Sequence, residues 1–447
     1  MASYFNALRV FNAEQFKNSI SDSNTALYLT FGKSDPWLDD SQPDNTTANT
    51  RSELDVWYNM IGAKRVVSSD FRHVVPRIDW TANTVYTQFD DSFDLTNLDA
   101  NLSNFYAMTS DYFVYKCLDN GANAVSTVMP TSTNTAGVVK TSDGYTWKFM
   151  YELSHEEKLR FLTADWLPVK TLSAYDGSLQ WDVQENATRG GLHAIVVENP
   201  GENYTNANSV IVSVFGDGYG AAAEATVNTI TNTISSIDVT DYGYGYSRAI
   251  VRVTGGNGAN CSARAVITPI GGHGSNPIYE LGASNLLIDV RMFGTEQNKY
   301  PGTTDYRQVA LLKDPWEYGT TNVSSNTVIS QTFDMTLYNY AVGVGAATDY
   351  SIGELVYQGT SYTDSTFSAR VVNWNSANAI LKVTQYGGYV TLAQTIYGLT
   401  TTTSKVVGAA QTPDLQPYTG QILYVDNFTP ITKDPDQIDD LKLVIKF

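Results

Sequence analysis

Two related stretches decide the fold, and each reads as a β-strand followed by a turn that ends in tyrosine. The first is Ile195-Val196-Val197-Glu198-Asn199-Pro200-Gly201-Glu202-Asn203-Tyr204. The second is Ile237-Asp238-Val239-Thr240-Asp241-Tyr242-Gly243-Tyr244-Gly245-Tyr246. Alternating apolar residues and a glycine cluster follow each stretch, with Gly218 matching Gly258, so the copies repeat at a spacing of about 40 residues. One copy has too few strands to bury its apolar face, and we expect two copies to pack together as one small β-domain.

The whole chain shows the same β character. It contains 29 tyrosines and 33 glycines, a composition that suits half-buried strands joined by tight turns. Helix signals are few. Asn12 can cap a helix through Ile20, Ser52 opens a segment that stops at Gly62, and Ser154 forms a capping box with Glu157. The sequence therefore predicts a mainly β protein, with a β-sandwich-like core and a few short helices.

A chain of 447 residues is too long for one ordinary domain. Beyond the repeat, another block rich in Thr, Tyr and Gly extends from about residue 330 to about residue 410. We expect a modular arrangement in five parts: an N-terminal α+β core region (1–190), the Gly/Tyr-rich repeat module (191–275), a continuation of the core (276–329), a second all-β module (330–412) and a C-terminal segment returning to the core (413–447).

Charge and cysteine content exclude several classes of function. The chain has 46 acidic and 28 basic residues, a net charge of −18, which argues against binding to nucleic acid or to a membrane surface. No apolar run approaches the roughly 20 residues of a spanning helix, and the N-terminus lacks the pattern of a signal peptide. Cys117 and Cys261 are too few for a disulfide framework or a zinc site. We expect folding in a reducing cytoplasm, with no metal and no cofactor.

No enzymatic motif stands out. His155-Glu156-Glu157 lacks the second histidine of a zinc-protease helix and reads as a capped helix with an acidic first turn. Gly216-Asp217-Gly218-Tyr219-Gly220 has no following Lys-Ser/Thr and opens no helix, so it is not a phosphate loop. We therefore expect a protein that is not an enzyme. Turns or a solvated acidic loop account for the other prominent carboxylates: Asp217 and Asp241 in glycine-rich turns, and Asp434, Asp436, Asp439 and Asp440 before the last strand.

Several separated segments, in order and at similar spacing, resemble the β-rich, dimeric wedge subunit of T-even-like phage baseplates. Among them are Leu29 to Trp37, Val74 to Trp80, and Gly420 to Tyr424. Their notable residues include turn glycines, rigid prolines and aromatic anchors, and they form no titratable constellation. The residues singled out by this resemblance, called the motif residues below, are Phe31, Gly32, Pro36, Trp37, Trp57, Gly62, Pro76, Arg77, Trp80, Tyr115, Gly144, Tyr145, Trp147, Arg307, Gln308, Tyr424 and Phe447.

The resemblance implies a structural protein of the virion. It implies a homodimer that is assembled in the host cytoplasm, docks on other baseplate wedge proteins, and helps couple host attachment to sheath contraction. The stretches at about 192–270 and about 330–412 have no counterpart in the family pattern, and we interpret both as insertions into the wedge-protein core.

A second interpretation is a receptor-binding or glycan-binding tail fibre or spike protein. It rests on the acidity of the chain and on its Gly/Tyr-rich repeats, and it predicts a trimer that binds host-surface glycans. A third, a glycosidase, requires two carboxylates that face each other across a cleft.

Overall fold

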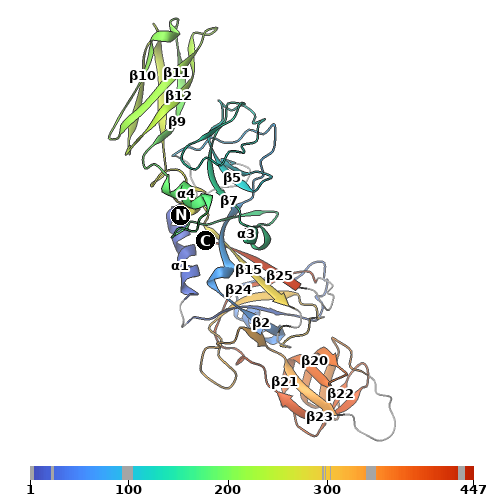
Figure 1. Ribbon diagram of the computed structural model, residues 1–447. Helices are drawn as coiled ribbons and strands as arrows, with labels where there is room; N and C mark the ends of the chain where they lie inside the picture. Colours follow the sequence, from blue (N-terminus) through green and yellow to red (C-terminus); the bar gives the residue numbers. More distant parts are fainter. Residues whose placement is uncertain are drawn as a thin grey trace. The chain divides into compact units, whose positions relative to one another are not determined.

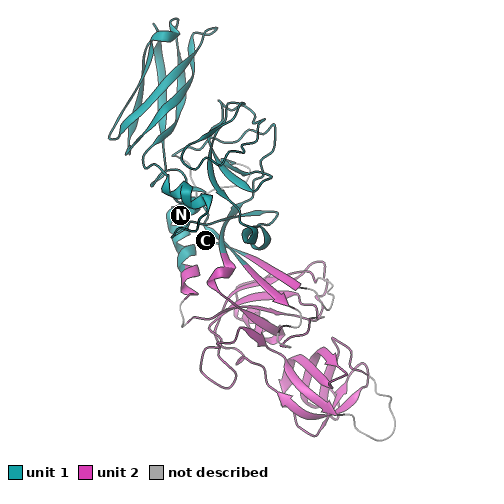
Figure 2. Ribbon diagram, viewed as in Figure 1, with its two compact units in different colours: residues 1–15, 72–288, 444–447 teal, residues 16–71, 289–443 magenta. Residues whose placement is uncertain are grey.

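The computed structural model describes residues 5–21, 25–92, 104–293, 296, 299–302, 304–338, 349–430 and 438–447. The chain divides into two compact units (Figure 2). Unit 1 contains residues 1–15, 72–288 and 444–447, and unit 2 contains residues 16–71 and 289–443. Each unit is therefore assembled from segments that are far apart in the sequence. The boundaries between the units fall within α1 (Asn6–Ser19), β3 (Phe71–Pro76), β15 (Asn285–Phe293) and β25 (Ile438–Lys446).

The core of unit 2 is a five-stranded antiparallel sheet in the order β17-β2-β1-β16-β24 (Figure 1). Every residue of the central strand β1 is buried. Val56 and Trp57 of helix α2 pack with Tyr28, Ala310 and Leu312 of this sheet, which fixes the helix on one face. The elements are β1 (Leu27–Gly32), α2 (Thr50–Asn59), β2 (Met60–Val66), the 3-10 turn η1 (Ser68–Asp70), β16 (Gln308–Lys313), β17 (Val328–Ser330) and β24 (Gln421–Asn427).

Unit 2 also contains a closed six-stranded barrel in the order β18-β21-β20-β19-β22-β23. β18 pairs with both β21 and β23, so the ring of strands has no open edge. Apolar side chains such as Met335, Phe367 and Leu381 fill its interior. The strands are β18 (Phe333–Tyr338), β19 (Leu355–Gly359), β20 (Ser365–Asn375), β21 (Ile380–Gly388), β22 (Thr395–Gly398) and β23 (Ser404–Gln411).

The body of unit 1 contains a four-stranded sheet in the order β4-β5-β7-β6, and β3 and β8 pair in a second sheet with the order β25-β15-β3-β8. One buried cluster contains Tyr115, Trp147 and Phe149, and a second contains Val114, Met150 and Tyr151. Trp147 and Phe149 share a cluster because of the two-residue period of the strand, and a register shift opposite Val114 and Tyr115 interrupts this period before Tyr151. The elements are β4 (Tyr106–Met108), β5 (Phe113–Asp119), β6 (Val139–Lys140), β7 (Thr146–Glu152), α3 (His155–Arg160), β8 (Trp166–Val169), α4 (Leu179–Glu185) and α5 (Pro277–Glu280).

The repeat forms a two-layered module within unit 1. A four-stranded sheet in the order β11-β12-β9-β14 packs its apolar residues against the β10-β13 ribbon. The strand order is symmetric. Exchanging each strand of the first copy (β9, β10, β11) with its equivalent in the second copy (β12, β13, β14) gives the same order read from the other end. Ile195 pairs with its own equivalent, Ile237, at the centre. The strands are β9 (Leu192–Glu202), β10 (Val210–Gly216), β11 (Tyr219–Asn228), β12 (Thr233–Tyr244), β13 (Ala249–Gly255) and β14 (Ala259–Ile267), with the 3-10 turn η2 (Ala207–Ser209).

The tyrosines that end the two repeated stretches are exchanged between the copies. Tyr204 of the first copy lies on Gly258 of the second, where an added Cβ would stand 2.4 Å from the ring. Tyr246 of the second copy lies on Gly218 of the first, where the distance would be 2.5 Å. Both tyrosines are buried, so each copy completes the core of the other.

The predicted fold class is confirmed, because strands dominate the described residues. The capping box of Ser154 and Glu157 is also confirmed. The start of α1 was predicted wrongly: the helix begins at Asn6 rather than after Asn12, since Val10 is fully buried and its packing extends the helix toward the N-terminus. The division into five parts, with two insertions, remains a prediction.

The prediction for α2 was wrong at both ends. Its N-cap is Asn49, whose side chain accepts a hydrogen bond from the Ser52 N–H at 3.0 Å, so Ser52 is not the cap. The helix ends at Asn59, before Gly62, because the chain enters β2 at Met60 and pairs with β1. Gly62 therefore lies within β2 and does not end the helix.

Replacing Gly258 or Gly218 by alanine is expected to loosen the repeat module, because the new methyl group overlaps a tyrosine ring that is packed in place. We expect the local free energy of opening of β9 to β14 to fall by about 1–3 kcal/mol in either variant. Hydrogen–deuterium exchange of these strands measures it. Gly387→Ala is the matched control, because nothing lies within 4 Å of its added Cβ. Equal protection in all three variants would contradict the exchanged packing.

Candidate functional site

The motif residues of unit 2 converge on the segment from residue 33 to residue 44, called the 33–44 loop. Arg307, which precedes β16, donates two hydrogen bonds to the Asp40 carboxylate, both at 2.9 Å, and a third to the Ser34 carbonyl at 2.9 Å. Its side chain is only 7% exposed. These hydrogen bonds lower the pKa of Asp40. A two-pronged ion pair of this kind fixes both distance and orientation, so Arg307 clamps the loop onto the sheet.

Two further motif residues fasten the same loop. The Trp37 indole N–H donates to the Phe428 carbonyl at 3.2 Å, and the Lys33 ammonium lies 5.0 Å from the centre of the Trp37 ring. Gln308 donates to the Asn427 side chain at 2.9 Å. Asn427 in turn donates to the Asp44 carbonyl at 2.9 Å, which ties the far end of the loop to β24. Pro36 is exposed beside Trp37.

The glycines of this region permit close contacts. An added Cβ on Gly62 would stand 2.9 Å from the Phe31 ring, and one on Gly32 would stand 2.3 Å from the Asn59 carbonyl oxygen. Phe31 packs edge-on against Tyr300 at 4.8 Å between ring centres. These motif residues therefore shape the sheet on which the loop rests. The remaining two in unit 2 are Trp57, on α2, and Tyr424, which pairs with Leu311 between β24 and β16.

A groove with a volume of about 600 Å³ borders the 33–44 loop, and we call it the Trp37 groove. It is lined by Trp37 and by polar side chains from α2 and the barrel. Gln385 donates to Asp35 at 2.5 Å and to Asn59 at 2.9 Å, and Arg370 donates to Gln385 at 2.7 Å. The polar groups of the groove are thus already held in position by one another.

The motif residues of the body of unit 1 mostly build its core. Tyr145 and Trp147 are fully buried and stacked, with ring centres 5.4 Å apart and an angle of 17°. Tyr115 belongs to the same cluster, and Trp80 packs against it while its indole N–H donates to Ser126 at 3.2 Å. Gly144 precedes Tyr145 in the turn that leads into β7 and has a positive φ of 91°, which favours glycine.

Other motif residues secure chain ends and turns in unit 1. Arg77 donates to Asp79 at 2.9 Å and to the Thr163 carbonyl at 2.9 Å. The carbonyl of Pro76 accepts from the Tyr106 hydroxyl at 2.7 Å, and the carbonyl of Phe447 accepts from Arg9 at 2.5 Å.

A buried charge network in unit 1 was not predicted from the sequence. Lys116 on β5 contacts Glu280 on α5 at 3.2 Å and His273 at 3.0 Å, and all three side chains are almost completely buried. Glu280 also accepts from the Gly274 N–H at 2.8 Å. Burial raises the pKa of Glu280, but Lys116, His273 and the Gly274 N–H together outweigh this effect and lower the pKa to about 2. Burial lowers the pKa of His273 to about 4, and it also lowers the pKa of Lys116.

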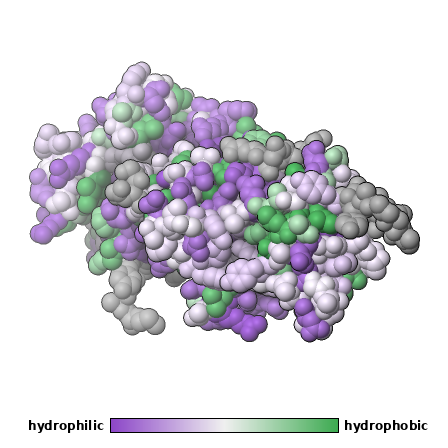
Figure 3. All heavy atoms as spheres, turned by 90° about the horizontal axis from the view of Figure 1, so that it is seen from below, coloured by the Kyte–Doolittle hydropathy of each residue, from purple (hydrophilic) through white to green (hydrophobic). Residues whose placement is uncertain are grey.

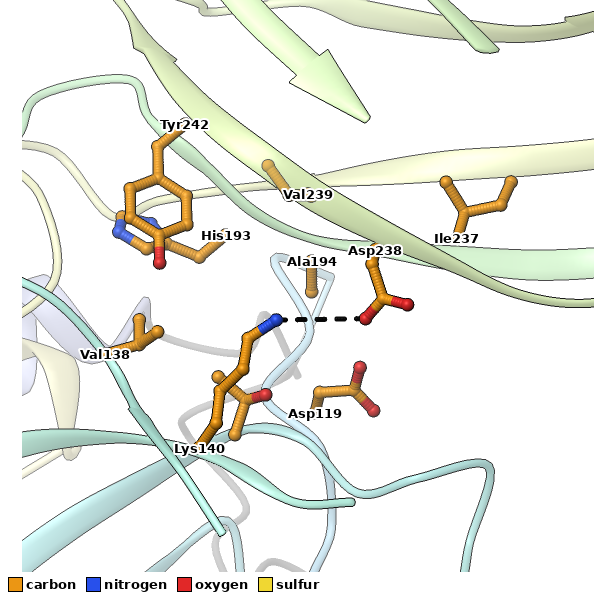
Figure 4. A pocket seen from close by; sticks show the side chains of 10 residues that line it. Asp119, Val138, Lys140, His193, Ala194, Ile237, Asp238, Val239 and Tyr242 are labelled. Carbon is orange, nitrogen blue, oxygen red and sulfur yellow. Dashed lines mark ion pairs between the residues drawn. The ribbon is translucent and has the colours of Figure 1, made fainter. Parts of the chain in front are cut away.

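A small pocket lies beside this network, between the body of unit 1 and the repeat module (Figure 4). His193 stacks on Tyr242 with ring centres 4.2 Å apart, and Lys140 lies 3.9 Å from Asp238. Burial raises the pKa of the neighbouring Asp119, and the hydrogen bond from the Gly121 N–H opposes this only in part. The pocket measures about 10 Å³, roughly the room for one water molecule, and it admits no substrate.

The carboxylates singled out in the sequence have structural partners. Asp217 lies between β10 and β11, as expected for a turn, and accepts from the N–H groups of Ser247 and Arg248 at 2.9 and 3.0 Å. Asp241 was also expected in a turn, but it lies on β12, where it accepts from the Gly243 N–H at 3.0 Å. Asp440 was expected in a solvated loop, but it lies on β25 and pairs with Arg291 at 2.7 Å. Asp439, also on β25, accepts from the Tyr306 hydroxyl at 3.3 Å, while Asp434 and Asp436 lie outside the described residues.

Two features of the described residues concern metal binding and membrane crossing. No group of three or more His, Cys, Asp or Glu side chains among them is arranged to hold a metal ion. None of the helices in this part of the chain is both long enough and apolar enough to cross a membrane.

Comparison with known proteins confirms the resemblance found in the sequence. The family model described as Bacteriophage T4, Gp8 matches residues 2–126. Baseplate wedge protein gp8 of Enterobacteria phage T4 is 23% identical over 212 residues, which cover 39% of this chain and 62% of the relative. The chain thus matches less than two thirds of the length of that relative. The motif residues from Phe31 to Tyr115 lie within the stretch matched by the family model, and those from Gly144 onward lie outside it.

Arg307→Lys is expected to free the 33–44 loop, because lysine keeps the charge but cannot make the two parallel hydrogen bonds to Asp40. We expect the free energy of unfolding to fall by about 1–3 kcal/mol and cleavage of the loop by protease to become faster. Arg51→Lys is the control, since the pair of Arg51 with Asp55 is largely exposed and contributes little. An unchanged cleavage rate in Arg307→Lys would show that Arg307 is not the clamp.

His273→Gln is expected to flatten the pH dependence of stability. Below pH 6.5 the unfolded chain binds a proton on this imidazole, whereas burial keeps the folded chain from binding it until about pH 4. The free energy of unfolding therefore falls as pH falls through this window, by up to about 3 kcal/mol from this residue. Thermal unfolding measured from pH 7 to pH 4 tests it. The exposed His155 provides the control, and an equal slope in wild type and His273→Gln would refute the assignment.

Proposed function

We propose that the chain is a structural subunit of the baseplate of a contractile phage tail. The observation that carries this proposal is the match of residues 2–126 to the family model together with the relationship to a baseplate wedge protein. The mainly β, modular architecture is consistent with it. In this role the protein is part of the virion and is located in the tail baseplate.

The chemistry of the motif residues supports a scaffolding role. Arg307 clamps a loop, Trp37 and Gln308 fasten the same loop to β24, and Tyr145 and Trp147 stack in a core. Each of these contacts fixes the position of one segment against another. None of them places a nucleophile or a general acid–base pair at an open surface, as a catalytic site requires.

The buried cluster of Lys116, His273 and Glu280 supports the same conclusion. Lys116, His273 and Glu280 form the most prominent cluster, and perturbed pKa values often mark active sites. Here the three side chains are at most 3% exposed and satisfy one another, and the pocket beside them has room for about one water. A network of this kind fixes the packing of β5 against α5. We therefore assign it to structure rather than catalysis.

We further propose that the protein is a homodimer that docks on other wedge proteins and helps couple host attachment to sheath contraction. A baseplate holds one arrangement and then adopts another, which suits rigid bodies joined by interfaces with two discrete packings. The closed barrel and the repeat module, in which each copy packs a tyrosine on the other, are suited to act as rigid bodies. On the face seen in Figure 3, hydrophobic residues gather in patches separated by hydrophilic ones. Such patches suit several separate contacts with neighbours.

The oligomeric state of the purified chain tests this proposal. We expect light scattering to give about twice the 49.1 kDa mass of one chain, and we expect this dimer to enter a larger complex with the other wedge proteins of the same phage. An equal mixture with an unrelated acidic β-protein is the control. A monomer at micromolar concentration that binds no wedge protein, or a trimer indifferent to them, would contradict the proposal and favour the receptor-binding interpretation.

A further inference from the structure

The scaffolding role does not use the interior of the Trp37 groove. Its volume of about 600 Å³ lies within the range of sites that enclose a small organic ligand. All the residues that line it belong to unit 2. Polar side chains that line the groove hold one another in position by hydrogen bonds, so a ligand would meet groups that are already oriented.

The lining of the groove is polar and nearly balanced in charge. Its cations are Lys33 and Arg370, and its anions are Asp35, Asp44 and Asp55. Such a balance suits neither a polyanion such as nucleic acid nor a strongly charged peptide. Side-chain amides, which both donate and accept hydrogen bonds, supply much of the remaining surface: Asn45, Asn59, Gln308, Gln385 and Asn427.

Apolar contacts in the groove come mainly from aromatic rings. Tyr58 is 48% exposed and stands between this groove and a second cavity of about 150 Å³, which it also lines. Trp37 is held in place by its indole hydrogen bond. Aliphatic side chains are confined to Pro36, Leu38 and Val425, so the groove lacks the apolar centre typical of a protein interface.

Aromatic rings beside side chains that both donate and accept hydrogen bonds are complementary to a sugar. A pyranose ring presents an apolar C–H face that packs on an aromatic ring and a rim of hydroxyl groups that donate and accept. We propose that the Trp37 groove binds a neutral oligosaccharide, with Tyr58 and Trp37 as packing surfaces. Asp35, Gln385 and Arg370 contact the hydroxyl groups. This site goes beyond the scaffolding role, and its failure would leave that role untouched.

The test is titration of the full-length protein with neutral hexasaccharides of the malto, isomalto, cello and chito series, followed by calorimetry and saturation-transfer NMR. We expect at least one of them to bind, and its monosaccharide to bind more weakly because the groove extends beyond one ring. Tyr58→Ala is expected to weaken binding about tenfold or more, since the packing surface is lost. Tyr58→Phe keeps the ring and is expected to bind within about twofold of wild type.

Tyr389→Ala is the matched control, because Tyr389 is 88% exposed and does not line the groove. Trp37→Ala is expected to weaken binding as well, and its melting temperature shows whether the 33–44 loop is still folded. The proposal is overturned if none of the four hexasaccharides binds, if Tyr58→Ala and Tyr389→Ala bind equally well, or if a hexasaccharide and its monosaccharide bind with the same affinity. Displacement of the bound sugar by a hexalysine peptide at low concentration would also overturn it in favour of a protein partner.

Discussion

Each β-module of this protein must cover its apolar face and limit the unpaired edges of its own sheets, and this constraint shapes the rest of the structure. An unpaired strand edge exposes backbone N–H and C=O groups that invite pairing with other chains. The block from Phe333 to Gln411 meets the constraint by closing completely, since β18 pairs on both sides. A module that closes on itself needs few partners elsewhere, which explains how such a block can be accommodated beside the sheet of unit 2.

The repeat module covers its apolar face by symmetry, while β11 and β14 remain the edges of its four-stranded sheet. Neither copy has enough strands for a sheet with a covered face, but the two together give four paired strands and a covering ribbon. The exchange of Tyr204 and Tyr246 then makes each copy depend on the other, because each ring lies on a glycine of the opposite copy. Folding of one copy alone would leave its tyrosine exposed and its glycine surface empty. The module is therefore expected to form and open as one unit.

Local signals in the sequence were sufficient for some of these features and insufficient for others. The match of Gly218 to Gly258 and the capping box of Ser154 depend on residues close in the chain, and both were recognised. The start of α1 was missed because burial of Val10, a tertiary effect, extends the helix. Arg307 was recognised only through resemblance, because its partner Asp40 is 267 residues away. The Lys116 and Glu280 pair, 164 residues apart, leaves no local pattern at all.

The Trp37 groove is lined by segments that carry motif residues and by barrel strands that carry none. Trp37 and Gln308 are motif residues, and their contacts with Phe428 and Asn427 set the position of one side. Arg370 and Gln385 come from β20 and β21 of the barrel, the block with no recognised counterpart in the family pattern. Gln385 of the barrel also donates to Asp35 of the 33–44 loop, so a change in the barrel wall removes one contact with the loop but leaves the clamp of Arg307 in place. A relative without the barrel would keep the clamp of Arg307 on Asp40 but would lack Arg370 and Gln385, and with them the proposed sugar contacts.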